Sequence, residues 1–344
     1  MKEIRIASVL PSDNNLTRIQ DLLRFKPEEH GFKFVYDDVN PEYVLVCHLI
    51  YEREDLFKRF CRYLHMNCVL IFFAGECVSP DLNLFDYAIC FDRSLQCSDR
   101  VFRLNTERFY EASIFSRFTQ KIYSKEDLKS KPGFCNFMYS HSYGNRDRLF
   151  HKISEYKKVE SIGRHLNNTG AKNTRYSADW RILSIEARLP YKFSIAAENA
   201  EFAGYVSEKI LSCLEAGTIP IYWGDPTIAE EFNVRRFINC SDYDSIDSVL
   251  ARIKELDEND DMYIGMLNEP WHTDEQMHML NKKETEYRTW ISSIFRGGDN
   301  RRRPQGTYPK IYRRWVCSRF RRGFMEKIKM MILRFLYVTG IRKS

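Results

Sequence analysis

The chain has 344 residues, 44% of them hydrophobic, and carries a formal net charge of +6. This length suits two domains, and the apolar content is sufficient for a buried core in each. No run of about 18 apolar residues occurs, so the sequence predicts no membrane-spanning helix. The ten cysteines include no C-x-x-C pair. This argues against a zinc site and favours free thiols in a reducing compartment.

Short apolar runs alternate with amphipathic stretches along the first 150 residues. We predict strands at residues 4–9, 32–36, 43–48, 69–73 and 87–91, with helices at 14–25 and 53–64. Residues 123–133 are polar and end in Lys-Pro-Gly, which predicts a loop. A second series has strands at 158–162, 192–197 and 218–223, and helices near 145–157, 205–216, 244–256 and 276–294.

This alternation predicts an α/β protein with two Rossmann-like domains that face a ligand-binding cleft. We expect the domains at residues 1–150 and 151–300, followed by a tail at 301–344. The tail contains 14 Lys and Arg and one acid, Glu326, so its net charge is +13. The preceding 300 residues therefore carry a net charge of −7. The tail and the rest of the chain therefore have net charges of opposite sign.

Apolar side chains recur at helical spacing within residues 308–337, with Arg and Lys between them. This pattern predicts an amphipathic helix that lies on an anionic membrane surface without crossing it. RNA binding is the competing interpretation of a basic stretch. No nucleic-acid module accompanies it, so we expect no nucleic-acid partner. Packing against the protein is the alternative for residues 308–315.

Residues 191–225 carry the clearest functional signal. A strand at 193–197 is followed by Glu198 and Asn199 at its carboxyl end, where ligands of such sheets bind. A helix is predicted to begin near Tyr205. Its first turn would hold Glu208 and Lys209, and a helix N-terminus favours an anion through its free N–H groups. A diphosphate beside Lys209 is one interpretation, and a solvated Glu-Lys pair is the other.

The spacing within this segment resembles a family signature. The string Glu198-Asn199-x5-Tyr205-Val-Ser-Glu-Lys209, followed by Thr218-Ile-Pro-Ile-Tyr-Trp-Gly-Asp-Pro226, resembles the alpha-1,3/1,4-fucosyltransferases, glycosyltransferase family 10. Ala197 replaces the aromatic residue of that signature, and Ser207 replaces Thr but keeps the hydroxyl. Residues 71–76, 81–92 and 308–316 resemble bacterial members of the family.

The resemblance implies a GT-B fold, with the acceptor held mainly by the N-terminal domain and GDP-fucose by the C-terminal domain. It implies an inverting transfer of L-fucose from GDP-beta-L-fucose to a hydroxyl of N-acetylglucosamine, or of glucose, in lactosamine- or lactose-type glycans. One carboxylate must then deprotonate the acceptor hydroxyl as GDP leaves from the opposite face.

The resemblance also assigns roles to individual residues. Glu76, which follows the apolar run 69–73, matches the proposed general base, although a Glu after a Gly is usually an exposed loop residue. Lys209 and Arg164 would neutralise the departing diphosphate, and Arg164 could instead be a surface arginine. Glu208 would hold the ribose. The remaining candidates for the donor pocket are Glu198, Asn199, Tyr205 and Tyr222.

No metal or other cofactor is expected, since side chains and helix ends would handle the phosphate charge. Asp242-Tyr-Asp244 has the spacing of a metal-binding Asp-x-Asp motif, but Asp244 precedes an apolar helical pattern and is predicted to be a helix cap. The absence of an anchor predicts a bacterial enzyme at the cytoplasmic face of the membrane. Two alternatives remain open: a GT-B transferase with another nucleotide-sugar donor, and a glycan-binding protein without catalytic activity.

Overall fold

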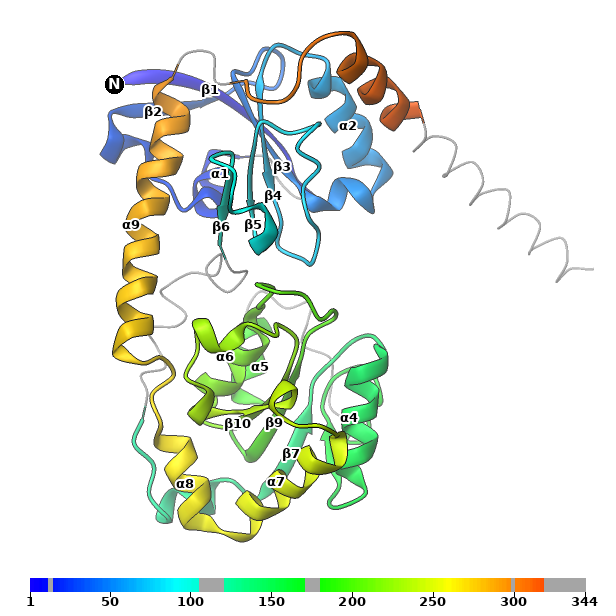
Figure 1. Cartoon of the computed structure of the whole chain (residues 1–344), viewed down its shortest axis with the longest axis vertical. Coiled ribbons are helices and arrows are strands. Elements are labelled where there is room, and N and C mark those ends of the chain that lie inside the picture. The colour runs from blue at the N-terminus through cyan, green and yellow to red at the C-terminus, as the bar shows by residue number, and fades with distance from the viewer. Residues whose placement is uncertain (12–14, 105–120, 171–179, 298–300, 319–344) are drawn as a thin grey trace, which may run out of the picture. The chain divides into compact units, whose positions relative to one another are not determined.

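The structure is a computed structural model that describes residues 1–11, 15–104, 121–170, 180–297 and 301–318 (Figure 1). The chain forms two compact units. The first comprises Met1–Phe73, Pro80–Ile89 and Ser292–Ser344, and the second comprises Ala74–Ser79 and Cys90–Ile291. The short segment Ala74–Ser79 therefore belongs to the second unit although both of its flanking segments belong to the first.

The first unit is built on a parallel sheet. Its helices and strands are β1 (Lys2–Val9), α1 (Leu16–Leu23), β2 (Phe32–Tyr36), β3 (Tyr43–Cys47), α2 (Glu54–Leu64), β4 (Val69–Phe73) and β5 (Tyr87–Cys90). The strand order in this unit is β2-β1-β3-β4-β5. Strand β6 (Val101–Arg103) belongs to the second unit. Every residue of β3 and β4 is buried, as expected for strands of a parallel sheet that is covered on both faces.

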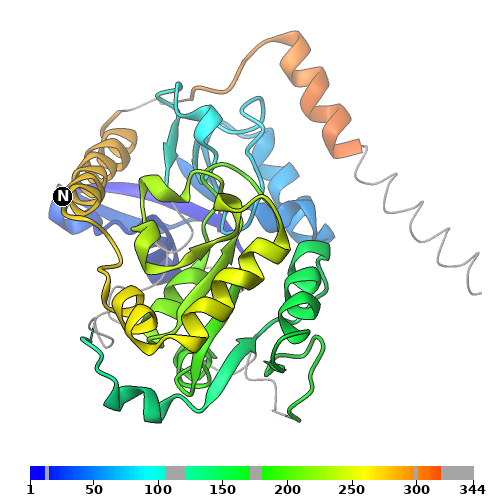
Figure 2. The same ribbon diagram turned by 60° about the horizontal axis from the view of Figure 1, so that its bottom comes forward.

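The second unit has a five-stranded parallel sheet in the order β11-β10-β9-β7-β8. Strands β7, β9 and β10 are labelled in Figure 1, and the green to yellow part of the ribbon that contains them comes forward in Figure 2. Its strands are β7 (Gly133–Phe137), β8 (Val159–Ser161), β9 (Tyr191–Ala197), β10 (Ile219–Trp223) and β11 (Ile238–Asn239). Its helices are α4 (Gly144–Ser154), α5 (Trp180–Glu186), α6 (Glu208–Glu215), α7 (Ile246–Glu258) and α8 (Asp260–Asn268). Helix α9 (Asp274–Arg296) begins in this unit and ends in the first.

Two apolar clusters cover the two faces of this second sheet. Side chains of α4, α7 and α8, such as Phe150, Ile253 and Tyr263, form one core with inward-facing residues of β7, β9 and β10. On the other face, Ile210 and Leu214 of α6 pack against alternate residues of β9 and β10. The sheet is thus buried on both sides, and its strand ends are left to carry polar side chains.

The eight predicted strands are all present, with ends within two residues of the prediction. Strands β6, β7 and β11 and helices α5 and α8 were not predicted. Two of the predicted helices differ at their first turn. Helix α6 begins at Glu208, not near Tyr205, because Ser207 is its extended N-cap residue. Helix α7 is capped by Ser245, whose side chain accepts a hydrogen bond from the Ser248 N–H, so the prediction that Asp244 is the cap was wrong.

The C-terminal region is described only in part. Residues 307–318 are helical, and Tyr308, Ile311 and Trp315 of this segment are exposed. The Tyr312 hydroxyl donates a hydrogen bond to Asp81 at 2.6 Å, and Arg313 donates to the Pro304 carbonyl at 2.8 Å. The remainder of the predicted amphipathic stretch 308–337 lies outside the described residues. Among the helices that are described, none has the length and apolar character needed to cross a bilayer.

Candidate active site

The site is built around the turn between β9 and α6 in the second unit. Glu198 follows the last residue of β9 and has no exposed surface. Its carboxylate accepts hydrogen bonds from the backbone N–H of Ser207 at 2.8 Å and from the Ser207 hydroxyl at 2.7 and 2.8 Å. The Lys209 ammonium donates to the same carboxylate at 2.7 Å. Glu198 therefore fixes both the N-cap and the cation of the first turn of α6.

Lys209 keeps its charge in this buried setting. Burial alone would lower its pKa, but the charges of Glu198 and Glu208 outweigh burial and hold the pKa above its ordinary value. The Ser207 hydroxyl bonds to Glu198 and makes no cap bond within α6. The first turn of α6 thus combines N–H groups that lack a side-chain cap with a fixed cation, which is an arrangement that binds anions.

Glu76 lies in the segment Ala74–Ser79, which follows β4 and belongs to the second unit. One of its carboxylate oxygens, Oε2, accepts hydrogen bonds from Asn199 Nδ2 at 3.0 Å and from the Tyr205 hydroxyl at 3.1 Å. Burial and the nearby charges of Glu198, Glu76 and Glu208 raise the pKa of Tyr205 well above its ordinary value. The phenol therefore stays protonated and remains a hydrogen-bond donor to Glu76.

A cavity of about 380 Å³ joins these two groups of residues. Five of the predicted site residues line it: Glu76, Asn199, Tyr205, Glu208 and Lys209. The cavity thus has a carboxylate at one place and a helix N-terminus with a fixed ammonium at another. Such a volume is within the usual range for small-molecule sites.

Three predicted donor-pocket residues do not line the cavity. Glu198 is fully buried and accepts a hydrogen bond from Lys209, which does line the cavity. Tyr222 is fully buried, and its hydroxyl accepts a hydrogen bond from the Asp225 N–H at 2.9 Å. Arg164 is exposed and donates to the Ser140 carbonyl at 3.2 Å, while the neighbouring Gly163 does line the cavity.

The structure adds residues that the sequence did not single out. Arg146 and Arg188 line the cavity, together with the aromatic side chains of Tyr139, His141, Tyr143 and Trp180. The guanidinium carbon of Arg146 lies 3.9 Å from the centre of the Tyr139 ring, and an Arg146 nitrogen donates to the Ala197 carbonyl at 3.1 Å. Tyr139, His141 and Tyr143 follow β7. Arg146 lies on α4, Trp180 on α5, and Arg188 in the turn after α5. The signal that could have found them is the position of residues 138–143 after a strand, but that strand was not predicted.

In the described part of the chain, no group of three or more His, Cys, Asp or Glu is placed to hold a metal ion. Asp242 accepts a hydrogen bond from Asn239 Nδ2 at 2.8 Å, so one member of the Asp-x-Asp motif serves the turn before α7.

Known proteins with similar sequences are fucosyltransferases. The chain is 31% identical over 232 residues to a putative fucosyltransferase of Acanthamoeba polyphaga mimivirus, covering 65% of this chain and 37% of that protein. It is 30% identical over 235 residues to the alpha-(1,3)-fucosyltransferase FucT of Helicobacter pylori, covering 60% of this chain and 48% of FucT. The match therefore spans less than half the length of either relative.

Solved structures with the same fold are glycosyltransferases. A crystal structure of an alpha1,3-fucosyltransferase superposes with a TM-score of 0.69 at 22% identity, covering 89% of this chain and 93% of the other. A crystal structure of an alpha1,3-fucosyltransferase with GDP-fucose superposes with a TM-score of 0.60 at 21% identity, covering 83% of this chain and 91% of the other. The structure of Anabaena HepE in complex with UDP-glucose superposes with a TM-score of 0.53 at 7% identity, covering 86% of this chain and 100% of the other. These likenesses confirm the predicted α/β fold of GT-B type.

Two family models match the sequence itself. The N-terminal domain of the alpha-(1,3)-fucosyltransferase FucT matches residues 30–110. The C-terminal domain of glycosyltransferase family 10 (fucosyltransferase) matches residues 128–311, more than half of the chain, and this range contains the β9–α6 turn. The chain therefore belongs to glycosyltransferase family 10, the fucosyltransferases.

Proposed function

We propose that this protein transfers L-fucose from GDP-beta-L-fucose to a hydroxyl of N-acetylglucosamine, or of glucose, in a lactosamine- or lactose-type glycan. One observation carries the proposal. The Glu76 carboxylate is held by Asn199 and Tyr205 in the same cavity as the first turn of α6 and Lys209. A base and an anion-binding helix end are the two elements that such a transfer requires.

The proposed reaction inverts the configuration at the anomeric carbon. A hydroxyl oxygen of the acceptor forms a bond to that carbon while the bond from the carbon to the diphosphate oxygen breaks. The hydroxyl proton passes to Glu76 through Oε1, because Oε2 already accepts two hydrogen bonds. The electron pair leaves with GDP, whose growing negative charge is stabilised by Lys209 and the N–H groups of α6.

Other cavity residues would orient the donor. We propose that Glu208 accepts hydrogen bonds from the ribose hydroxyls. Asn199 holds Glu76 through its Nδ2, and its Oδ1 is buried without a hydrogen-bond partner among the described residues. Arg146 and Arg188 would supply further positive charge along the cavity. In this proposal no metal takes part, since side chains and the helix end neutralise the diphosphate.

A donor and acceptor screen with purified protein tests the proposal. We expect transfer from GDP-fucose, and none from GDP-mannose or UDP-galactose, to type 1 and type 2 lactosamine chains or lactose in the presence of EDTA. Glu76→Gln should abolish transfer and leave GDP affinity within about twofold, because the amide keeps the shape but cannot take a proton. Transfer from another sugar nucleotide alone would identify a different GT-B transferase. The absence of any turnover would favour a glycan-binding protein.

We also propose that the basic tail brings the protein to anionic membranes, peripherally at the cytoplasmic face. Two observations support this. Tyr308, Ile311 and Trp315 are exposed at helical spacing, with 84%, 55% and 45% of their surfaces accessible. The residues from 301 onward carry a net charge of +13. Exposed aromatic side chains beside cations are typical of helices that bind at the bilayer interface.

A further inference from the structure

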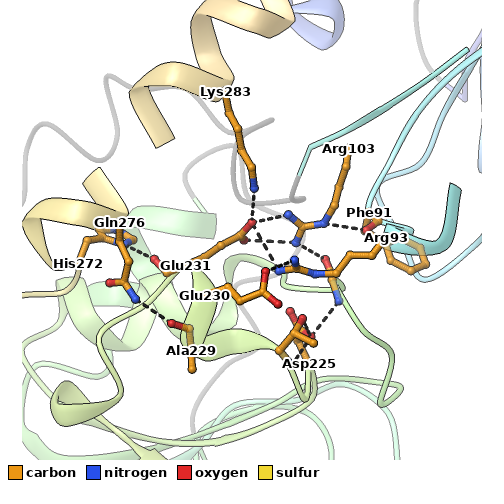
Figure 3. A network of polar contacts seen from close by, with 12 residues as sticks. Phe91, Arg93, Arg103, Asp225, Ala229, Glu230, Glu231, His272, Gln276 and Lys283 are labelled. Carbon is orange, nitrogen blue, oxygen red and sulfur yellow. Dashed lines mark hydrogen bonds and ion pairs between the residues drawn. The ribbon is translucent and has the colours of Figure 1, made fainter. Parts of the chain in front are cut away.

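A buried cluster of charged side chains lies in the second unit, outside the cavity (Figure 3). At its centre, the Arg103 guanidinium pairs with both carboxylate oxygens of Glu231. Lys283 of α9 donates to the same carboxylate at 2.8 Å. Burial alone would raise the pKa of Glu231, but the charges and hydrogen bonds of Arg103 and Lys283 outweigh it and hold the pKa well below its ordinary range. Glu231 is therefore ionised and anchors Arg103.

Arg103 uses two further donors on backbone carbonyls. Its Nε donates to the Phe91 carbonyl at 3.0 Å, and its Nη2 donates to the Gly204 carbonyl at 3.0 Å. The Gly204 N–H in turn donates to Asp225 Oδ1 at 2.8 Å. Both polar backbone groups of Gly204 are thus fixed by buried side chains. The guanidinium is well suited to this task because it presents five donors in a rigid plane.

Gly204 is required at this place. Its φ of +91° is unfavourable for other residues, and a Cβ would lie 2.5 Å from the Phe91 carbonyl oxygen and 2.8 Å from Arg103 Nε. The next residue along the chain is Tyr205, whose ring also packs edge-on against Phe91 at 5.2 Å between ring centres. The position of the Tyr205 ring is therefore set by contacts that converge on Arg103 and Phe91.

We propose that Arg103 is a positioning residue for the transfer reaction. By holding the Gly204 carbonyl, it fixes the place from which the Tyr205 hydroxyl donates to Glu76, 3.1 Å away. Arg103 does not line the cavity, so it acts on the carboxylate through Tyr205. This inference rests on the proposed role of Glu76 as the base.

A double-mutant cycle with Arg103→Lys and Tyr205→Phe tests the inference. Lysine at position 103 keeps a positive charge beside Glu231, which Lys283 also neutralises. A single ammonium group cannot replace the planar guanidinium that donates to the carbonyls of both Phe91 and Gly204. Each single variant should lower kcat about tenfold, the loss expected for one hydrogen bond to a carboxylate. If Arg103 acts through the Tyr205 hydroxyl, the double variant should be no slower than the slower single variant.

The cycle has readouts that a purely structural role would not reproduce. The KM for GDP-fucose and the affinity for GDP should stay within about twofold in all three variants, because the effect falls on the base and not on the donor. Additive losses, about hundredfold in the double variant, would overturn the inference. So would a loss of GDP affinity that parallels the loss of kcat.

A second pair of variants tests the position of the Gly204 carbonyl without changing Arg103. Gly204→Ala should displace the loop and lower kcat, again without a further loss when combined with Tyr205→Phe. Gly265→Ala on α8 is the matched control, since its Cβ would meet nothing within 4 Å, and it should have wild-type kcat. Glu76→Gln separates the two proposals. If that variant still transfers fucose, Glu76 is not the base, and if the wild type transfers none, the proposed function fails. Additivity in an enzyme that needs Glu76 removes only the role of Arg103.

Discussion

The Lys209 ammonium lies 2.7 Å from a carboxylate oxygen of Glu198, a side chain without exposed surface. The cation that is proposed to receive a diphosphate is therefore already paired in the protein alone. An anion at the α6 N-terminus would share Lys209 with Glu198 and would not have to organise a mobile side chain. Glu198 is fully buried, whereas the Lys209 side chain is 19% exposed and lines the cavity. Variants of this pair can therefore separate the effect on stability from the effect on ligand binding.

Lys209→Met should lower the free energy of unfolding by about 3–5 kcal/mol, because it leaves the Glu198 carboxylate buried without its counter-ion. The double variant Glu198→Gln/Lys209→Met should recover most of this loss, since no buried charge remains. GDP binding should be lost in both. Urea denaturation and calorimetric titration with GDP measure the two effects. A double variant that recovered GDP affinity along with stability would contradict the role of Lys209.

Two adjacent glutamates offer a matched test of the buried cluster. Glu231→Gln removes a carboxylate that Arg103 and Lys283 require, and it should cost about 3–5 kcal/mol of stability. Glu230→Gln removes one of the two carboxylates that pair with Arg93 and leaves Glu231 in place. The Glu230 side chain is 59% exposed, so the change should cost less than about 1 kcal/mol. Chemical denaturation of the two variants side by side measures the difference. Equal losses would mean that the cluster does not stabilise the fold through Glu231.

Glu215 should make the stability of the protein depend on pH. Burial on α6 raises its pKa to about 8, although Arg181 partly offsets this. Between the unfolded pKa of about 4.3 and this value, the unfolded chain releases a proton that the folded chain keeps, so stability falls as pH rises.

The matched variants are Glu215→Gln, which removes this titration, and Glu255→Gln, which changes a side chain that is 52% exposed. We expect Glu215→Gln to gain stability relative to wild type at pH 8 but not at pH 4.5. Glu255→Gln should follow the wild type at both. Thermal melts at the two pH values decide this, and parallel pH profiles for wild type and Glu215→Gln would contradict it.

The membrane proposal predicts a separable tail. Residues 319–344 contain eight Lys and Arg and one acid. Their deletion should weaken binding to vesicles that contain anionic lipid by at least about tenfold, because each basic residue near such a surface contributes about 1 kcal/mol. Transfer to a soluble acceptor should stay within about twofold. Sedimentation with anionic and with neutral vesicles measures the binding of the full chain and of the truncated chain. Equal binding of both to anionic vesicles would contradict the proposal.

Much of the fold could be predicted from the sequence because its strands are continuous buried runs. Val69–Phe73 and Tyr43–Cys47 are apolar at every position, as parallel strands are when helices cover both faces. Strand β7 was missed because Gly133–Phe137 mixes Gly, Cys and Asn with aromatics and follows a Lys-Pro pair that favours a loop. Helix α8 was missed because it begins at Asp260, directly after the Asn259 cap that ends α7.

The candidate site could be predicted only where a local motif marked it. The resemblance pointed to Glu76, Asn199, Tyr205, Glu208 and Lys209, and these residues line one cavity. The local motif could not show that Glu198 is fully buried and does not line the cavity, since burial depends on contacts from distant segments. Arg103 had no local signal at all. Its importance comes from Gly204 and Glu231, which are 101 and 128 residues away along the chain.

The segments Ala74–Ser79 and Cys90–Arg103 belong to the second unit although they precede the whole C-terminal family domain in the chain. This limits how relatives can be recombined. A hybrid joined near residue 120 would take Glu76 and Arg103 from one parent and Asn199, Gly204 and Tyr205 from the other. Exchanging whole N-terminal halves to change the acceptor would therefore combine the proposed base of one parent with the residues of another parent that hold it. Grafting loops of the first unit, while keeping Ala74–Ser79 and Cys90–Arg103 of the recipient, would leave Glu76 and Arg103 with the partners from their own chain.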